Sequence, residues 1–246
     1  MNKLFENVSE YRDVGYSYVE QLIPKELVIA VRTCIVEHLE KHPDWKHAWQ
    51  LLDPEVYTNS KGQTMPYFLQ RPGMYDETFK KIVEHPRLIQ KMEELLGGKV
   101  KFFTDQVGIK YGDINNDQGG RSYYHQDAYY WNIPPQRGAN VWIPLDTVAK
   151  DQIALAVMPG SQKNGVIEEH EQYFDNPNSG HYIENQWKPF KRHRIPSKNT
   201  EFAKETLLPM NPGDGLFFSN HTWHRSEPNR SGVTKMFYAI AYELLD

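Results

Sequence analysis

Residues 123–131 read YYHQDAYYW, and this stretch raises the question of what the chain folds around. Five aromatic residues flank His125 and Asp127. Aromatic side chains favour half-buried strands, and residues i and i+2 of a strand point to the same face. We therefore expect His125 and Asp127 to project together from one face, with Gln126 on the other. Two metal ligands need that arrangement, and an ordinary buried His–Asp hydrogen bond has it too.

Short apolar and aromatic runs continue on both sides of this stretch and are typical of β-strands. They cover residues 99–112, 122–133, 139–148, 153–161, 205–210, 213–226 and 235–245. Gly, Pro, Asn and Asp separate the runs. Short strands at this spacing predict a β-sandwich or barrel.

The first third of the chain has helical patterns instead. Residues 24–41 carry apolar side chains at helical spacing, and residues 77–96 form two helical pieces broken at Pro86. We expect one domain over residues 1–246, with helical support over about 1–99 and a β core over about 100–246. The stretch 163–205 is long and polar, which is typical of a lid over a site.

Composition narrows the function classes. Lys and Arg number 28 against 32 Asp and Glu, so the net charge of −4 gives no support for a nucleic-acid partner. The single cysteine, Cys34, excludes an internal disulfide or a multi-cysteine zinc site, and its helical context indicates a core residue. No signal peptide or membrane span is visible, so we expect a cytoplasmic protein with no membrane and no protein partner implied.

A third ligand is sought among the ten histidines. His221 and His224 lie in the run 213–226, and regular alternation would place His224 on the face of Leu216 and Phe218, with His221 opposite. Two imidazoles and one carboxylate on one face of an octahedral metal suit non-haem Fe(II) oxygen chemistry. Zinc accepts the same three ligands. The His-x-Asp pair alone does not decide between them.

Together these motifs resemble the phytanoyl-CoA dioxygenase family. The resemblance rests on HQD at 125–127 and on the later run His224, Ser226, Asn229 and Ser231. It covers most of the chain and includes the VWIPLD strand and an MPGSQKNG turn, where Gln162 replaces a usual histidine in what we take to be a structural role. The family implies a double-stranded β-helix (jelly-roll) core, Fe(II), 2-oxoglutarate as cosubstrate, and O2.

Carried over by position, the family pattern implies that His125, Asp127 and His224 are the iron ligands. Halogenating relatives replace the carboxylate with Gly or Ala. The presence of Asp127 therefore favours hydroxylation, desaturation or ring closure over halogenation.

The resemblance also implies a cosubstrate pocket. Ser226 would meet a 2-oxoglutarate carboxylate, and Gln106 and Trp142 would line the pocket. The family usually has an arginine eleven residues after the distal histidine, where this chain has Lys235. We expect Lys235 to bind the far carboxylate, although a lysine lacks the planar fork of arginine. The alternative is that Lys235 merely begins the strand in solvent and Arg230 binds the carboxylate.

Substrate contacts are expected from Tyr129 and Trp131, with packing in the core as the alternative for both. An anionic substrate group could be held by Arg71 or Arg137. The leading hypothesis is an oxygenase that attacks an unactivated C–H bond of a small-molecule metabolite in specialised biosynthesis, releasing succinate and CO2. The alternatives are a zinc- or other metal-dependent hydrolase or isomerase, or a non-catalytic metal-binding jelly-roll protein.

Overall fold

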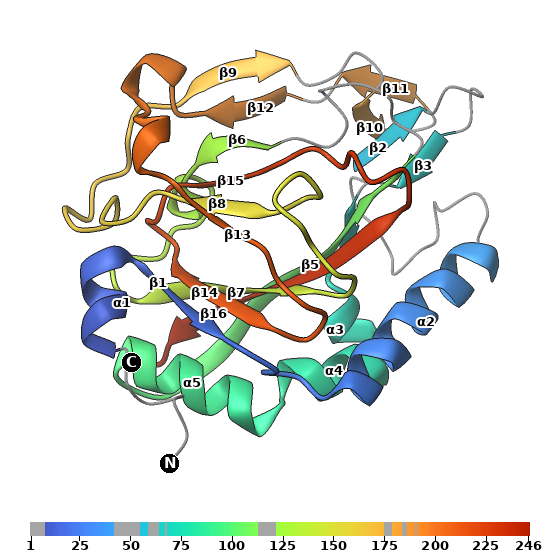
Figure 1. Cartoon of the computed structure of the whole chain (residues 1–246), viewed down its shortest axis with the longest axis horizontal. Coiled ribbons are helices and arrows are strands. Elements are labelled where there is room, and N and C mark those ends of the chain that lie inside the picture. Colours follow the sequence, from blue (N-terminus) through green and yellow to red (C-terminus); the bar gives the residue numbers. More distant parts are fainter. Residues whose placement is uncertain are drawn as a thin grey trace.

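A computed structural model of the chain describes residues 8–41, 55–58, 64–66, 68–112, 122–174, 179–183, 186–189 and 191–246. Two antiparallel sheets face each other in it (Figure 1). The larger has the order β1 (Tyr16–Val19), β14 (Gly215–Ser219), β7 (Gly138–Pro144), β16 (Lys235–Leu244), β5 (Val100–Lys110), β4 (Phe68–Gln70). The smaller has the order β13 (Thr206–Leu208), β8 (Leu155–Val157), β15 (His224–Ser226), β6 (Ser122–His125).

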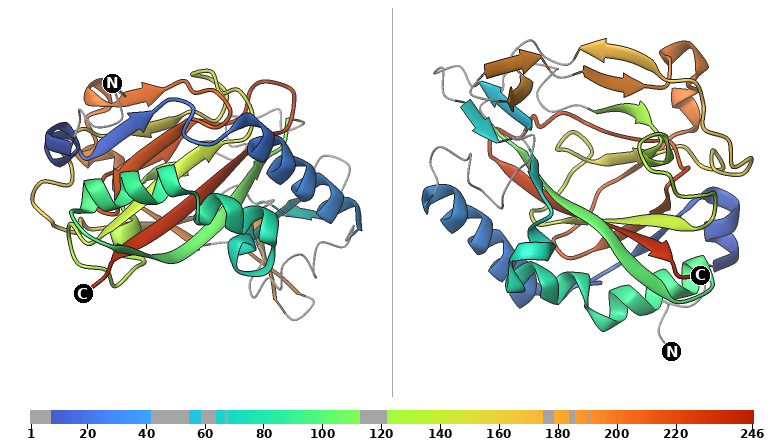
Figure 2. Two further views of the ribbon diagram at one scale, coloured as in Figure 1. Left: turned by 90° about the horizontal axis from the view of Figure 1, so that it is seen from below. Right: turned by 180° about the vertical axis from the view of Figure 1, so that it is seen from behind.

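Helices cover the outer face of the larger sheet (Figures 1 and 2). They are α1 (Val8–Val14), α2 (Lys25–Lys41), α3 (Pro72–Tyr75), α4 (Glu77–Val83) and α5 (Pro86–Leu96). The expected break between the last two helices is confirmed, because Pro86 begins α5 and Gly97, at φ 80°, ends it. Glycine adopts this left-handed conformation without steric cost.

Residue alternation along the strands of the larger sheet separates two apolar layers. On β16, one set of side chains packs in the core shared with the helices: Met236, Tyr238, Ile240 and Tyr242. The alternate set lines the space between the sheets: Phe237, Ala239 and Ala241. Strand β7 repeats the pattern, with Val141 and Ile143 in the helical core and Trp142 between the sheets. Both faces of this sheet are thus buried, and burying one large apolar side chain contributes roughly 1.5–3 kcal/mol.

A further layer lies over the smaller sheet, at the top of Figure 1. Strands β2 (Glu55–Thr58), β3 (Thr64–Pro66), β10 (Ser179–Ile183) and β11 (Gln186–Pro189) pair in the order β11-β10-β2-β3, and β9 (Glu171–Phe174) pairs with β12 (Lys191–Arg194). The stretch 163–205 is therefore not the plain loop that its polarity suggested, although 175–178, 184–185 and 190 lie outside the described residues.

The stretch 123–131 also differs from expectation. Strand β6 ends at His125, and Asp127 begins a short 3-10 helix, Asp127–Tyr129. The backbone N–H groups of Tyr130 and Trp131 both donate to the carbonyl of Asp127, so the chain turns where an aromatic strand was predicted. His125 and Asp127 consequently belong to different elements and meet through this turn.

The expected fold class, mainly β with flanking helices around a jelly-roll core, is confirmed. Cys34 packs at the edge of the helical core, and its thiol donates to Asp76 at 3.2 Å. Burial raises the pKa of this thiol to about 12, which leaves it a poor nucleophile at neutral pH.

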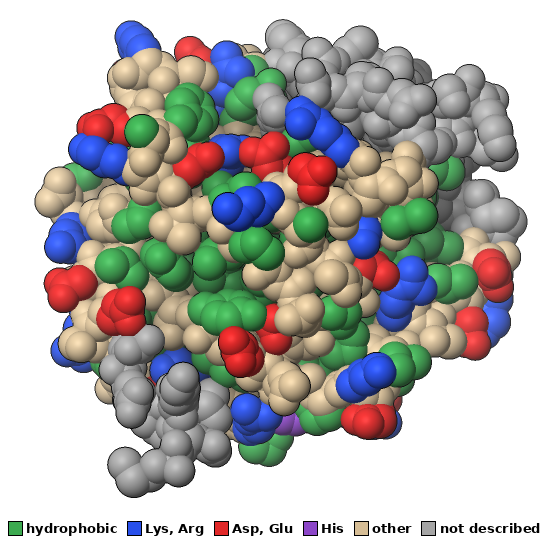
Figure 3. Space-filling model, in the orientation of Figure 1, with side chains coloured by type: hydrophobic (Ala, Val, Ile, Leu, Met, Phe, Trp, Pro, Cys, Tyr) green, Lys and Arg blue, Asp and Glu red, His purple; other side chains and the backbone are tan. Residues whose placement is uncertain are grey.

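The described surface is mixed in charge. On the face seen in Figure 3, Lys and Arg side chains are interspersed with Asp and Glu. No helix among the described residues is both long enough and apolar enough to cross a membrane.

Candidate metal centre and its cavity

Three side chains meet at the inner face of the smaller sheet. One ligand atom each from His125, Asp127 and His224 lies within 4.8 Å of the others. His125 closes β6 and His224 opens β15, and these two residues are register partners across the ladder. The Nε2 atom of His125 lies 3.8 Å from one Asp127 oxygen, and Nε2 of His224 lies 3.5 Å from the other.

Backbone carbonyls orient both imidazoles. Nδ1 of His125 lies 2.8 Å from the carbonyl of Tyr123, and Nδ1 of His224 lies 3.0 Å from that of Thr222. A ring nitrogen facing a carbonyl carries the proton, so the other nitrogen, Nε2, keeps its lone pair for a metal. Each histidine thus presents its acceptor nitrogen to Asp127.

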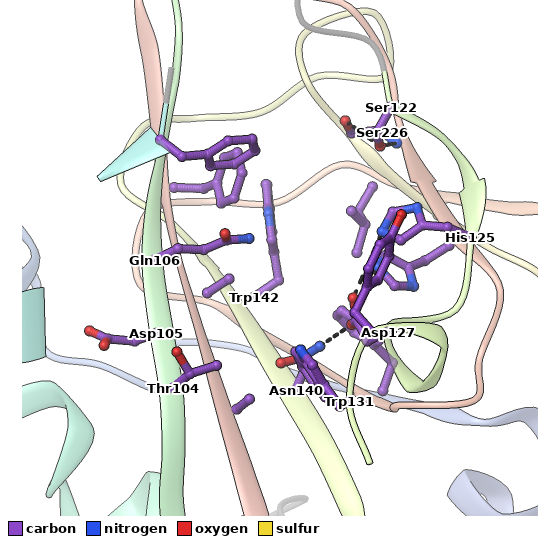
Figure 4. A pocket seen from close by; sticks show the side chains of 18 of the residues that line it. Thr104, Asp105, Gln106, Ser122, His125, Asp127, Trp131, Asn140, Trp142 and Ser226 are labelled. Carbon is purple, nitrogen blue, oxygen red and sulfur yellow. Dashed lines mark hydrogen bonds and ion pairs between the residues drawn. The ribbon is translucent and has the colours of Figure 1, made fainter. Parts of the chain in front are cut away.

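Asn140 holds the carboxylate in place, although no role was predicted for it. Its side-chain amide donates to Asp127 Oδ2 from the inner face of β7 (Figure 4). Asn140 is buried and lies on the same face of β7 as Trp142. A buried amide on a strand that packs apolar residues on both sides is the signal that could have identified it.

The electrostatics fit a site that receives a cation. Burial raises the pKa of Asp127 to about 6, against the opposing effects of His125 and the Asn140 hydrogen bond. Burial lowers the pKa of His224 to about 4, so the imidazole is neutral near pH 7. A neutral imidazole is the form that binds metal, and a cation would offset the cost of an ionised carboxylate held away from water.

His221 lies elsewhere, as expected. It is buried, and its Nδ1 lies 3.0 Å from the side-chain oxygen of Asn220. The regular alternation used to separate the two histidines does not hold, because β14 ends at Ser219 and a turn leads to His224. Thr222 in this turn donates to the carbonyl of Gly15 rather than facing the metal ligands.

A cavity of about 420 Å³ opens in front of the three ligands. Figure 4 shows Gln106 and Trp142 projecting into it from the larger sheet, on the side of β5 opposite to the Asp105 carboxylate. The aromatic rings of Phe218 and Phe237 close its apolar side. The cavity therefore offers both a candidate metal site and space for organic ligands.

Comparison with known proteins places this site in a family. Residues 11–237 match the phytanoyl-CoA dioxygenase (PhyH) family. The chain belongs to that family. The family and enzyme class expected from the sequence, a 2-oxoglutarate-dependent dioxygenase, are confirmed.

Individual relatives agree in class and differ in substrate. L-proline trans-4-hydroxylase of Streptomyces griseoviridis is 33% identical over 99 residues, 39% of this chain and 35% of that protein. Thus the aligned region spans about a third of that relative. The 1-deoxypentalenic acid 11-beta-hydroxylase of Streptomyces exfoliatus is 27% identical over 90% of this chain and 73% of its own length.

A solved structure shares the fold. The non-heme alpha ketoglutarate dependent carbocyclase SnoK from nogalamycin biosynthesis superposes with a TM-score of 0.69, over 100% of this chain and 85% of its own. The two sequences are only 16% identical, so this likeness concerns the fold.

The family's usual cation position does not reach the cavity here. Lys235 is the first residue of β16, and its ammonium donates to the carbonyl of Thr147 at 2.8 Å near the surface. Arg230 is exposed and is not part of the cavity lining. In this structure the Lys235 side chain turns outward to the loop that carries Thr147, although its contact with the cosubstrate stays a prediction.

Another lysine reaches the cavity instead. Lys110, at the end of β5, is 3% exposed, lines the cavity, and donates from Nζ to Ser226 Oγ at 2.9 Å. Ser226 also lines the cavity, and its contact with a 2-oxoglutarate carboxylate stays a prediction. Gln106 and Lys110 lie four residues apart on β5 and so share a face, which is the signal that sequence analysis missed.

The expected substrate residues divide into two groups. Trp131 and Arg71 line the cavity, joined by Tyr130. Tyr129 does not line the cavity but stacks on His170, with ring centroids 4.2 Å apart. Because the chain turns after Asp127, Tyr130 rather than Tyr129 faces the cavity.

Arg137 lies outside the cavity. It donates to the carbonyl of Leu244 and to Asp246, and so ties down the end of β16. Gln162 has the structural role expected of it: its amide donates to the carbonyl of Arg12, next to Gly15.

Proposed function

We propose that this member of the phytanoyl-CoA dioxygenase family uses Fe(II), 2-oxoglutarate and O2 to hydroxylate, desaturate or cyclise a small-molecule metabolite. The observation that carries the proposal is the convergence of His125, Asp127 and His224 at the wall of the cavity. Two imidazoles and a carboxylate leave open positions on an octahedral metal, as this chemistry requires.

The residues present fit iron. Both Nε2 atoms are left as acceptors by the Nδ1 contacts with backbone carbonyls, and Asp127 is turned toward them by Asn140. The bound metal and cosubstrate would supply the oxidising power, with succinate and CO2 as co-products. The chain's own residues would bind the reactants, orient them and exclude water.

Three features of the cavity support these roles. Asp127 and the two histidines would fix the metal on one side, while Trp142 and Gln106 would face the cosubstrate from the larger sheet. Ala239 and Ala241 of β16 leave room in the cavity, and the aromatic rings of its lining would help to exclude water. Asp127 is the carboxylate whose presence argues against halogenation.

The substrate would approach from the side of Arg71, Tyr130 and Trp131. Tyr173 of β9 and His193 of β12 also line the cavity, so the 163–205 stretch contributes to this entrance as a lid would. Arg71 offers a cation for an anionic group, and the aromatic rings offer flat apolar contacts. A compact metabolite with one acidic group and an apolar ring or chain fits this lining best, and we place the enzyme in specialised biosynthesis.

The proposal is tested under anaerobic conditions. Purified protein is loaded with Fe(II), 2-oxoglutarate is added, and the weak visible charge-transfer band of the chelate is recorded, with Zn(II)-loaded protein as the blank. We expect the band with iron only. Iron binding without a band at saturating 2-oxoglutarate would refute the proposal and favour the metal-dependent hydrolase alternative.

A further inference from the structure

The end of β5 carries a cluster of hydrogen-bonding groups on the opposite side of the cavity opening from Arg71. It consists of Lys110, Ser122 and Ser226, which we call the lysine–serine cluster. Lys110 Nζ lies 2.9 Å from Ser226 Oγ, the two serine hydroxyls lie 3.0 Å apart, and the N–H of Ser226 donates to Ser122 Oγ at 2.7 Å. All three residues line the same cavity as the metal ligands.

The backbone of Lys110 is fixed by the motif that follows the distal histidine. Asn229, 2% exposed, donates from its amide to the carbonyl of Lys110 at 2.7 Å and to that of Val233 at 2.8 Å. Ser231 in turn donates to the Asn229 side-chain oxygen at 2.7 Å. The motif therefore surrounds Lys110: Ser226 accepts from its ammonium, Asn229 donates to its carbonyl, and Ser231 supports Asn229.

The cluster is a donor site suited to an anion. Ser122 Oγ and Ser226 Oγ accept from an N–H and an ammonium respectively, so their hydroxyl protons can turn toward each other or toward a ligand. Lys110 is 3% exposed and lines the cavity, and a hydrogen bond between an ammonium and a carboxylate is stronger than one between neutral groups. The position is also set apart from the substrate entrance, because Lys110 and Arg71 come from opposite ends of the β4–β5 pairing.

The register of the sheet explains why Lys110 takes this place. Lys110 on β5 is the direct register partner of Lys235 on β16, where the family usually has its arginine. Neighbouring strands are about 4.8 Å apart. Lys110 therefore lies one strand away from the position of the family's arginine and at the same level of the sheet.

We propose that Lys110, with Ser226 and Ser122, binds the far carboxylate of the 2-oxo acid cosubstrate, in place of the residue at position 235. This inference rests on the proposed function.

The experiment compares two ligands and two variants. Wild type, Lys110→Met and Lys235→Met are loaded with Fe(II) under anaerobic conditions and titrated with 2-oxoglutarate and with 2-oxopentanoate, which lacks the far carboxylate. The charge-transfer band gives each Kd without turnover. The Fe(II) affinity of each variant and its far-UV circular dichroism confirm that the fold and the metal site are intact.

We expect wild type and Lys235→Met to bind 2-oxoglutarate more tightly than 2-oxopentanoate by about 10- to 100-fold, the size of a charge-assisted hydrogen bond. Lys110→Met should lose that preference and bind both ligands weakly. The inference is overturned if Lys235→Met loses the preference and Lys110→Met keeps it, or if wild type binds both ligands equally. A wild type that forms no band with either ligand refutes the proposed function instead, so the two failures are distinguishable.

Discussion

Removing the Asn140 amide should weaken metal binding without touching a ligand. Asn140 donates to Asp127 Oδ2 from the opposite sheet, and it is the side-chain donor to that carboxylate among the described hydrogen bonds. In Asn140→Ala the carboxylate loses this bond and can rotate away from the two Nε2 atoms. We expect the Kd for Fe(II), or for Co(II) as a stable substitute, to rise.

The size of the effect follows from the burial of the site. A hydrogen bond to a charged, buried partner contributes about 1.5–3 kcal/mol, which corresponds to about a 10- to 150-fold change in Kd. Mutations of groups that orient metal ligands usually cost 10- to 100-fold in affinity. The pKa of Asp127, already raised to about 6 by burial, should rise further because the Asn140 bond holds it down.

The assay is an anaerobic metal titration by calorimetry at pH 7.5 and at pH 6.0. Asn140→Ala should show the larger loss at pH 6.0, where more of its Asp127 is protonated. Asn140→Asp is a stricter variant, because a second carboxylate beside Asp127 should weaken binding at pH 6.0 by favouring a shared proton. If Asn140→Ala binds metal within threefold of wild type at both pH values, the amide does not orient Asp127 and our account of the site is wrong.

Three further outcomes are expected. His224→Ala should abolish tight metal binding while His221→Ala retains it, measured as metal content after dialysis; equal loss in both would contradict the assignment. Burial raises the folded-state pKa of Asp105 to about 6 from 3.8, so the stability linked to this group is fully present below about pH 4 and is lost as pH rises through 6. Urea denaturation should show wild type losing roughly 2–3 kcal/mol over that window relative to Asp105→Asn, and parallel curves would refute this. Gly108→Ala should cost about 1–3 kcal/mol, because the new Cβ would lie 2.1 Å from the Phe237 ring; unchanged urea midpoints would show that the ring can move aside.

The three candidate metal ligands could be predicted because their chemistry is local and distinctive. A histidine and a carboxylate two residues apart, with a distant histidine in a polar turn, are unusual in an otherwise aromatic strand context. The prediction of convergence was right although its reason was partly wrong, since Asp127 sits on a turn rather than on the strand. The prediction survived this error because the family motif is recognised by the spacing of its residues, whether Asp127 lies in a strand or in a turn.

Asn140 and Lys110 could not be assigned in the same way. A polar residue at alternate positions of a strand usually marks the solvent face, and only the placement of the smaller sheet turns that face into a cavity wall. The choice between Lys235 and Lys110 depends on where a long side chain ends, four bonds from Cβ. That depends on Thr147 for Lys235 and on Ser226 for Lys110, and each of these acceptors is distant in sequence from the lysine that donates to it.

Lys110 and Lys235 are register partners on neighbouring strands and so form one rung of the sheet, which bears on how an anion-binding site can change during evolution. If a site has a single cation, substitutions that move it to another strand one at a time pass through a protein that has no cation at the site. A rung that carries two lysines removes this obstacle, because either one can drift while the other serves. On this rung Lys110 lines the cavity, while Lys235 turns to a surface loop.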